Sequence, residues 1–316
     1  MTPWMNLPKA ELHVHLEGSF SLKRALELAN KQKSHPWKGL CTRALTEKLN
    51  TKSFPEFLEQ FKLGYRLLQS SRDYQMVTED LLSELQRQNT VAADIIYSPG
   101  VAFQLLGLSL HDIHSGIEAG LRQFPNMKVR LILDTVLNLG VAFMERTLNA
   151  VLSQPPSALA GFSIGGGNPH ITMEPFLFLF EKAQKNGLFC VAHSGEVDPP
   201  ENTALLLRET DLVRIAHGLN TVKSPELLKA IQEKQIVMDL SLSSNLKTGV
   251  CKKIEEHPII QFHDWHIPFT INTDDPFYFQ TTLINEYQLA EKLLGKEGVE
   301  RARRLSLKIF KKYLTK

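Results

Sequence analysis

The sequence of residues 188–218 is LFCVAHSGEVDPPENTALLLRETDLVRIAHG, and this stretch decides the fold. One short apolar run occupies 188–195, a second occupies 213–218, and each ends in glycine. Runs of this length, bounded by turn residues, are typical of buried strands. The pattern predicts two strands joined by an intervening segment, which is the repeating unit of a parallel sheet.

Similar runs occur at six other places along the chain. The eight predicted strands lie at 10–15, 93–100, 129–136, 160–167, 188–195, 213–218, 236–244 and 268–275. Most intervening segments carry apolar residues at helical spacing, for example Leu227, Leu228 and Ile231. Eight such units predict a (β/α)₈ barrel, an α/β fold whose functional residues lie at the carboxyl ends of the strands.

One long segment, at about 20–90, exceeds what a loop and a single helix require, and we expect a helical cap there. Apolar residues within it repeat at helical spacing. These residues are Phe54, Leu58, Phe61, Tyr65 and Leu68. Most of this stripe is expected to be core, with one or two side chains facing the pocket. The chain, 1–316, is predicted to be a single domain carrying this insertion.

The composition excludes several classes of partner. The 36 Lys and Arg against 34 Asp and Glu give a net charge of +2, too weak a field to attract nucleic acid. Cys41, Cys190 and Cys251 lie far apart, which argues against disulfides and thiolate metal sites and indicates a cytoplasmic protein. The sequence shows neither a signal peptide nor an apolar run of about 18 residues, so no membrane partner is expected. The sequence contains no heptad pattern from which an oligomeric state could be predicted.

Two histidines, His13 and His15, lie two residues apart on the first predicted strand, so both point the same way. Alone, such a pair is more often a hydrogen-bonded part of a core than a metal site. Other ligand-type residues follow the ends of later predicted strands. They are His193 and Glu196 after the fifth, His217 after the sixth, and Asp274 and Asp275 after the eighth. Because strand ends converge at one mouth of a barrel, the whole set predicts a metal centre.

The chemistry of these donors favours zinc. Three imidazoles and one carboxylate suit Zn²⁺ and leave a position for water. The predicted ligands of one Zn²⁺ per chain are His13, His15, His193 and Asp274. Spacing alone also allows Asp275 in place of Asp274. Glu196 and His217 are then free for proton transfer beside the metal.

Five motifs resemble the adenosine deaminase family in order and spacing. They are LPKAELHVHLEGS at 7–19, HSGE at 193–196, RIAHG at 214–218, SLSSNLKTG at 241–249 and NTDDP at 272–276. The resemblance extends to TTLINEYQLA at 281–290 and so covers nearly the whole chain. One difference is Ser194, where the family usually has Ala, and its hydroxyl is expected to hydrogen-bond locally.

The resemblance implies a zinc-dependent hydrolytic deaminase of a 6-aminopurine nucleoside, with adenosine or 2′-deoxyadenosine as the first expectation. Glu196 would protonate N1 of the purine, and His217 would orient and help to deprotonate the attacking water. Asp275 would contact the water or N7, and the backbone at Gly166 would approach N3. Glu17 replaces an Asp that touches a ribose hydroxyl in the family, and Glu is the form found in adenine deaminases.

Other substrates and other classes stay open. YSPGVAFQ (97–104), RLILDTV (130–136) and GFSIGGGNP (161–169) resemble aminodeoxyfutalosine deaminases of menaquinone synthesis, the second expectation. Adenine and N6-methyl-AMP follow. A two-metal hydrolase on the same barrel is disfavoured because the end of the fourth predicted strand carries neither Lys nor an acid. A catalytically silent relative that binds a nucleoside is the alternative from another class.

Overall fold

The computed structural model describes residues 3–167 and 169–313, and within them eight parallel strands form one sheet in chain order. The strands are β1 (Lys9–His15), β2 (Thr90–Tyr97), β3 (Lys128–Val136), β4 (Leu159–Gly165), β5 (Phe189–Ser194), β6 (Leu212–His217), β7 (Val237–Leu240) and β8 (Phe269–Ile271). A parallel bridge between Val14 and Asp274 brings the end of β8 against β1. The predicted (β/α)₈ barrel is therefore confirmed.

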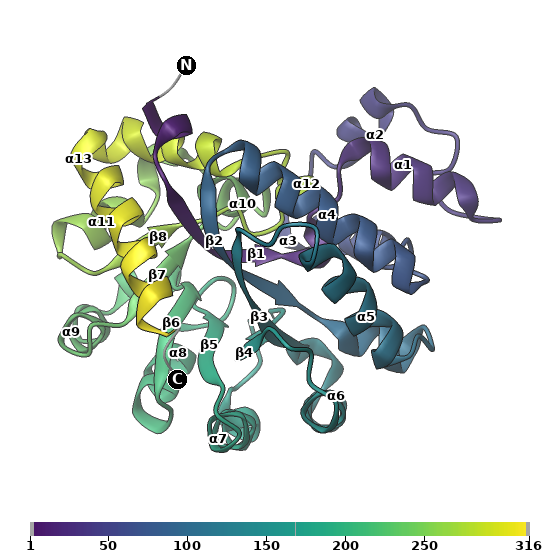
Figure 1. Cartoon of the computed structure of the whole chain (residues 1–316). Coiled ribbons are helices and arrows are strands. Elements are labelled where there is room, and N and C mark those ends of the chain that lie inside the picture. The colour runs from purple at the N-terminus through teal and green to yellow at the C-terminus, as the bar shows by residue number, and fades with distance from the viewer. Residues whose placement is uncertain (1–2, 168, 314–316) are drawn as a thin grey trace.

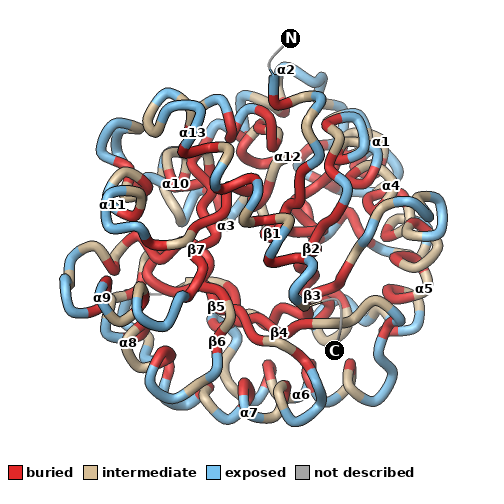
Figure 2. Tube along the Cα trace, turned by 60° about the vertical axis from the view of Figure 1, so that its left-hand side comes forward, coloured by how far each residue is buried: buried red, intermediate tan, exposed pale blue. Residues whose placement is uncertain are grey.

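Helices surround the strands (Figure 1). The connections after β2 to β6 each contain one long helix: α5 (Leu110–Leu121), α6 (Val141–Ser153), α7 (Leu177–Lys185), α8 (Pro200–Glu209) and α9 (Pro225–Glu233). After β7 and β8 come α10 (Leu242–Lys247), α11 (Ile259–Asp264), α12 (Pro276–Phe279) and α13 (Leu283–Lys312). In Figure 2 the strands at the centre are buried, while the outer faces of the helices are exposed.

The long connection after β1 contains α1 (Leu22–Lys31), α2 (Thr42–Lys48), α3 (Phe54–Tyr65) and α4 (Ser71–Arg87). The hydroxyl of Ser53 accepts a hydrogen bond from the backbone N–H of Glu56, and Pro55 follows at the start of the helix, so α3 begins at Phe54. Phe57 then packs against Phe279 of α12, with 5.0 Å between ring centroids. This contact holds α3 against the barrel.

All eight predicted strands exist, but the last two, β7 and β8, are much shorter than expected. Residues 241–244 were predicted as strand, whereas Leu242 already begins helix α10. This short helix brings Ser244 against the carboxylate of Asp274, with 2.7 Å between Oγ and Oδ2. Strand β8 ends at Ile271, and residues 272–275 form the loop that carries the site.

Alternating side chains of β2, β3 and β5 fill the barrel in layers. The lowest layer holds Asp94 and Arg130, joined by two hydrogen bonds of 2.7 and 2.8 Å. Above them Ile96, Ile132 and Val191 form a small apolar cluster. The next inward positions are Ser98, Asp134 and His193. The polar residues of these three strands are thus concentrated at the carboxyl-end mouth.

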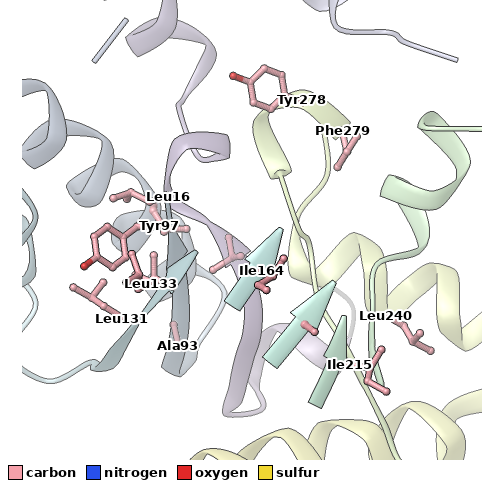
Figure 3. Packing of buried hydrophobic residues seen from close by; sticks show 14 of the residues in the cluster. Leu16, Ala93, Tyr97, Leu131, Leu133, Ile164, Ile215, Leu240, Tyr278 and Phe279 are labelled. Carbon is pink, nitrogen blue, oxygen red and sulfur yellow. The ribbon is translucent and has the colours of Figure 1, made fainter. Parts of the chain in front are cut away.

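The opposite faces of the strands form the main apolar core with the helices. Leu131 and Leu133 of β3 belong to it, whereas Ile132 between them belongs to the interior cluster. Figure 3 shows members of this core from strands around the barrel together with Tyr278 and Phe279 of α12. Both faces of every strand are therefore occupied, which fixes the positions of the strand ends.

Candidate active site

Four side chains converge at the mouth of the barrel in an arrangement that could hold one metal ion. Their ligand atoms all lie within 4.8 Å of one another, and all four residues are buried. They are His13, His15, His193 and Asp274. The Nε2 atoms of the three histidines are 3.2 to 3.3 Å apart. Ligands of a tetrahedral ion at about 2.0 Å are separated by about 3.3 Å, so this spacing fits a metal.

The backbone explains how these side chains meet. His13 and His15 share one face of β1, and His193 projects from β5 across the barrel. Asp274 has a φ of 64°, a left-handed conformation uncommon outside glycine, and its Oδ1 lies 3.2 Å from Nε2 of His13. Backbone strain of this kind persists where the surrounding structure fixes it. Here the bridge to Val14 supplies that constraint.

Outer hydrogen bonds orient the ligands. Nδ1 of His193 lies 3.1 Å from the carbonyl oxygen of Ile164, which can accept its proton and leave Nε2 free to bind a metal. Ser244 donates to Oδ2 of Asp274, and Oδ1 is the oxygen that faces His13 and His15. Hydrogen-bond partners of this kind hold the metal-binding side chains in position before a metal ion binds.

His217 and Glu196 lie beside the four ligand residues. Nε2 of His217 is 3.8 Å from Oε2 of Glu196 and 4.0 Å from Oδ2 of Asp274. The amide of Asn245 holds the other side of the imidazole, 3.2 Å from Nδ1, and also contacts His257 at 3.1 Å. His217 has a φ of 62°, a second left-handed residue within the site.

The loop after β5 is fixed by Asp198. Its carboxylate accepts hydrogen bonds from the backbone N–H of Gly195 (2.7 Å) and the hydroxyl of Ser194 (3.2 Å). Ser194 also contacts the hydroxyl of Thr203 at 2.8 Å, so this serine makes the local hydrogen bonds expected of it. Glu196, between Gly195 and Asp198, is thereby aimed at the metal residues.

Burial gives the two proton-transfer candidates opposite properties. Burial and the charge of Asp274 raise the pKa of Glu196 well above its usual range. Burial lowers the pKa of His217 to about 3. Burial therefore favours the protonated form of Glu196 and the neutral form of His217, an arrangement suited to giving one proton and accepting another.

Asp275 lies on the other side of the site and is also buried. Its Oδ1 has no hydrogen-bond partner among the described residues. Burial and the charge of Asp274 raise its pKa. A side chain at position 18 would overlap this carboxylate, so the glycine in the HLEG motif leaves the space that Asp275 occupies.

A pocket of about 410 Å³ leads from these residues toward α3. The polar groups described above form its floor, and apolar side chains form most of its outer wall. The apolar lining residues include Phe54, Phe57, Leu58, Phe61, Tyr65, Val101, Leu105, Leu106, Val136 and Leu139. Its size lies in the range of roughly 300 to 1,000 Å³ that is typical of small-molecule sites.

Comparison with known proteins agrees with this geometry. The sequence model of the adenosine deaminase family matches residues 8–309. The chain belongs to this family. An adenine deaminase of Stutzerimonas stutzeri is 31% identical over 97% of both chains, and an aminodeoxyfutalosine deaminase of Streptomyces avermitilis is 30% identical over 91% of this chain and 81% of its own. The crystal structure of an adenine deaminase from Arthrobacter aurescens covers 95% of this chain and 93% of its own, with a TM-score of 0.89 at 21% identity.

Membership of this family makes the chain a hydrolase that deaminates an adenine-type substrate at an amidine C–N bond. No helix in the described part of the chain is both long and apolar enough to cross a membrane.

The structure brings most of the predicted site residues of this deaminase into the pocket. The lining includes His15, His193, Asp274, Glu196, His217, Asp275 and Gly166, while His13 lies just beneath. Gly166 has a φ of 85°, and the side chain of Asn138 clamps the next residue, Gly167, through hydrogen bonds of 3.0 and 3.1 Å. The glycine turn is thus ordered against the pocket.

Glu17 occupies a different position. It is completely buried, and its Oε1 accepts a hydrogen bond of 3.0 Å from the backbone N–H of Ser98 rather than lining the pocket directly. Its role toward substrate stays a prediction.

Several residues of the pocket were not predicted. Ser98 and Asp134 lie at the ends of β2 and β3, and Lys62 and Arg66 stand at the outer wall. The apolar stripe of α3 also contributes more than expected, because Phe54, Leu58, Phe61 and Tyr65 all line the pocket. Leu68, the last residue of the predicted stripe, lies beyond the end of α3 and belongs to the core. Asp134 lies two residues before the end of β3, within an apolar run that gave no separate signal for it.

Proposed function

We propose that this deaminase is a zinc enzyme that hydrolyses the 6-amino group of a purine nucleoside, with adenosine or 2′-deoxyadenosine as the first candidates. The products would be inosine or 2′-deoxyinosine and ammonia. The observation that carries the proposal is the pocket, which joins the four-residue metal cluster to a proton donor and continues beyond them to α3. That extension leaves room for a substituent on the purine.

The four ligand residues fit zinc by donor type as well as by spacing. Nitrogen from imidazole and oxygen from carboxylate are the donors of catalytic zinc sites. His13, His15, His193 and Asp274 would hold the ion. Bound zinc would lower the pKa of water toward about 7 and so make a nucleophile available at neutral pH.

The remaining polar residues then have separate tasks. Glu196, whose pKa is raised by burial, gives its proton to N1, which makes C6 more electrophilic. His217 holds the attacking water with Nε2 and helps to remove its proton. Asp275 contacts the water or N7, the backbone at Gly166 approaches N3, and Glu17 acts on the sugar side through Ser98. Addition of hydroxide, formed from the attacking water, to C6 is followed by loss of ammonia.

A second candidate is a substrate whose N9 substituent carries an acid, which includes aminodeoxyfutalosine and AMP-type nucleotides. Lys62 and Arg66 line the pocket, as do the exposed Leu105 and Leu106. Two cations next to an apolar surface favour a substituent that is partly apolar and ends in a negative charge.

Parallel assays separate these candidates. Ammonia release would be measured with the zinc-loaded protein on adenosine, 2′-deoxyadenosine, adenine, AMP, N6-methyl-AMP and aminodeoxyfutalosine, and Glu196→Gln would serve as the inactive control. Turnover of a nucleoside by the wild type alone supports the proposal. Turnover of adenine only would contradict it, and zinc binding without any turnover would identify a silent relative.

A further inference from the structure

Asp134 is a buried carboxylate at the pocket wall that none of these steps uses. It lies near the end of β3, lines the pocket and is 3% exposed. Its Oδ2 accepts a hydrogen bond of 2.9 Å from the hydroxyl of Ser98. Its Oδ1 has no hydrogen-bond partner in the described part of the chain, and Nδ1 of His193 is 4.0 Å from it, beyond hydrogen-bond distance. An unpaired buried carboxylate oxygen is costly, so this atom lacks a donor that a ligand could supply.

The carboxylate is also held in place. Ser98 donates its backbone N–H to Glu17 at 3.0 Å, and its carbonyl oxygen accepts a hydrogen bond of 3.3 Å from the hydroxyl of Tyr65. On the other side a side chain at Gly165 would overlap Asp134, so the absence of one allows the carboxylate its position. Ser98 therefore links two buried acids, each with one oxygen that lacks a partner.

The strand order predicts which part of the substrate meets Asp134, provided that the proposed function is correct. In that function Glu196 after β5 meets N1, Gly166 after β4 meets N3, and Asp275 after β8 meets N7. Along the purine edge, N9 lies between N3 and N7. Around the barrel, β3 and β2 follow β4 on the way to β1 and β8. The N9 side of the base therefore faces Asp134 and Ser98.

We propose that Asp134 is a specificity-determining residue that accepts a hydrogen bond from a donor on the N9 side of the substrate. A carboxylate only accepts hydrogen bonds, and the neighbouring N3 and N7 of an N9-substituted purine are acceptors too. The donor is therefore a sugar hydroxyl of a nucleoside or the N9–H of a free base. A site built around such a donor discriminates strongly against analogues that lack it.

The test compares ligands with and without that donor. Adenosine carries sugar hydroxyls, adenine carries N9–H, and 9-methyladenine carries neither. For each, kcat/KM and the dissociation constant would be measured with the wild type, Asp134→Ala and Asp134→Asn, all loaded with zinc. Asp134→Asn preserves the shape of the side chain and one acceptor oxygen, so it covers the case in which the alanine variant fails to fold. Zinc content is the readout for effects through His193, whose Nδ1 lies 4.0 Å from Oδ1 of Asp134.

The expected result is a loss of about 10- to 100-fold in kcat/KM for the donor-bearing substrate in Asp134→Ala, a smaller loss in Asp134→Asn, and less than about twofold change for 9-methyladenine. Zinc content would be unchanged. Equal losses on all three ligands, or loss of zinc, would overturn the proposal and make Asp134 a positioning residue for His193. If the wild type deaminates nothing yet binds a donor-bearing ligand through Asp134, only the proposed function fails.

Discussion

The two walls of the pocket differ in how firmly they are held. On the barrel side, His13, His217 and Asp274 are at most 5% exposed, and each has polar neighbours within 4 Å. On the outer side, Leu105 and Leu106 are 59% and 48% exposed. The barrel wall belongs to strands within the core, whereas the outer wall rests on α3 and on the short segments that follow β2 and β3.

This difference assigns different functions to the two walls. Chemistry at C6 requires fixed distances, and the strand ends provide them because the whole core holds them. Substrate choice requires only a complementary surface, and loops and caps can vary without disturbing the barrel. Substitutions in the barrel wall should therefore lower kcat or metal binding, and those in the outer wall should change KM.

The largest effect is expected from removing a metal ligand. His193→Ala deletes a nitrogen 3.2 Å from those of both other histidines, so zinc should be lost and ammonia release should fall to background. Metal content by mass spectrometry and the deaminase assay check both points. Exposed His111 provides the control through His111→Ala. Deaminase activity in a zinc-free His193→Ala variant would show that the residues of the barrel wall do not act through a bound metal ion.

Glu196→Gln should have the next largest effect. The amide retains the shape but cannot give a proton to N1, so kcat should fall about 10²- to 10⁴-fold while KM and zinc content change little. Steady-state kinetics with metal analysis measure this. The matched control is Glu181→Gln on the outside of α7, whose side chain is 64% exposed. A loss of only a few-fold would remove Glu196 from the proton-transfer step.

The pH profile tests the same residue more finely. The pKa of Glu196 is raised by burial, and its protonated form is the active one. Activity is therefore present below the raised pKa and is lost as the pH rises through it. The profile of kcat/KM should show an alkaline limb in the wild type that is absent from Glu196→Gln. An identical limb in both proteins would assign it to another group.

The smallest effect is expected from the outer wall. Phe61→Ala removes an aromatic ring that lines the pocket and packs on Tyr278 at 5.2 Å. KM should rise about tenfold with kcat nearly unchanged, because substrate and transition state lose the same apolar contact. Phe178→Ala, on an exposed ring of α7, is the control. A fall in kcat instead would mean that α3 also controls the chemistry.

The same difference between walls explains what the sequence could predict. His13, His15 and His193 could be predicted from their positions on or after predicted strands, because strand ends must converge in a barrel, whereas spacing alone did not distinguish Asp274 from Asp275 as the fourth ligand. The parts of the pocket wall that come from helices depend on the packing angles between helices and strands. The local sequence pattern does not indicate these angles. Lys62 and Arg66 line the pocket because α3 is packed on α12, for example through Phe57 and Phe279.

Local ambiguity accounts for the remaining differences. The sequence of residues 241–244, SLSS, is compatible with a strand and also with the start of a helix. In the structure, tertiary contacts favour the helix, and Leu242 begins α10. Asp134 lies in an apolar run whose pattern conceals a single acid. Only the inward alternation of β3, together with the hydrogen bond from Ser98 just after β2, reveals that it faces the pocket.

The contact between β1 and the end of β8 also has a consequence for folding. The backbone N–H of Leu12 donates to the side chain of Asn272, 260 residues away, and the bridge at Asp274 lies beside it. Closing so long a loop requires the intervening strands to be in place first. The metal site spans this closure, since His13 and His15 lie on one side and Asp274 on the other. Metal affinity should therefore appear late in folding, with the last strand, and so report completion of the barrel.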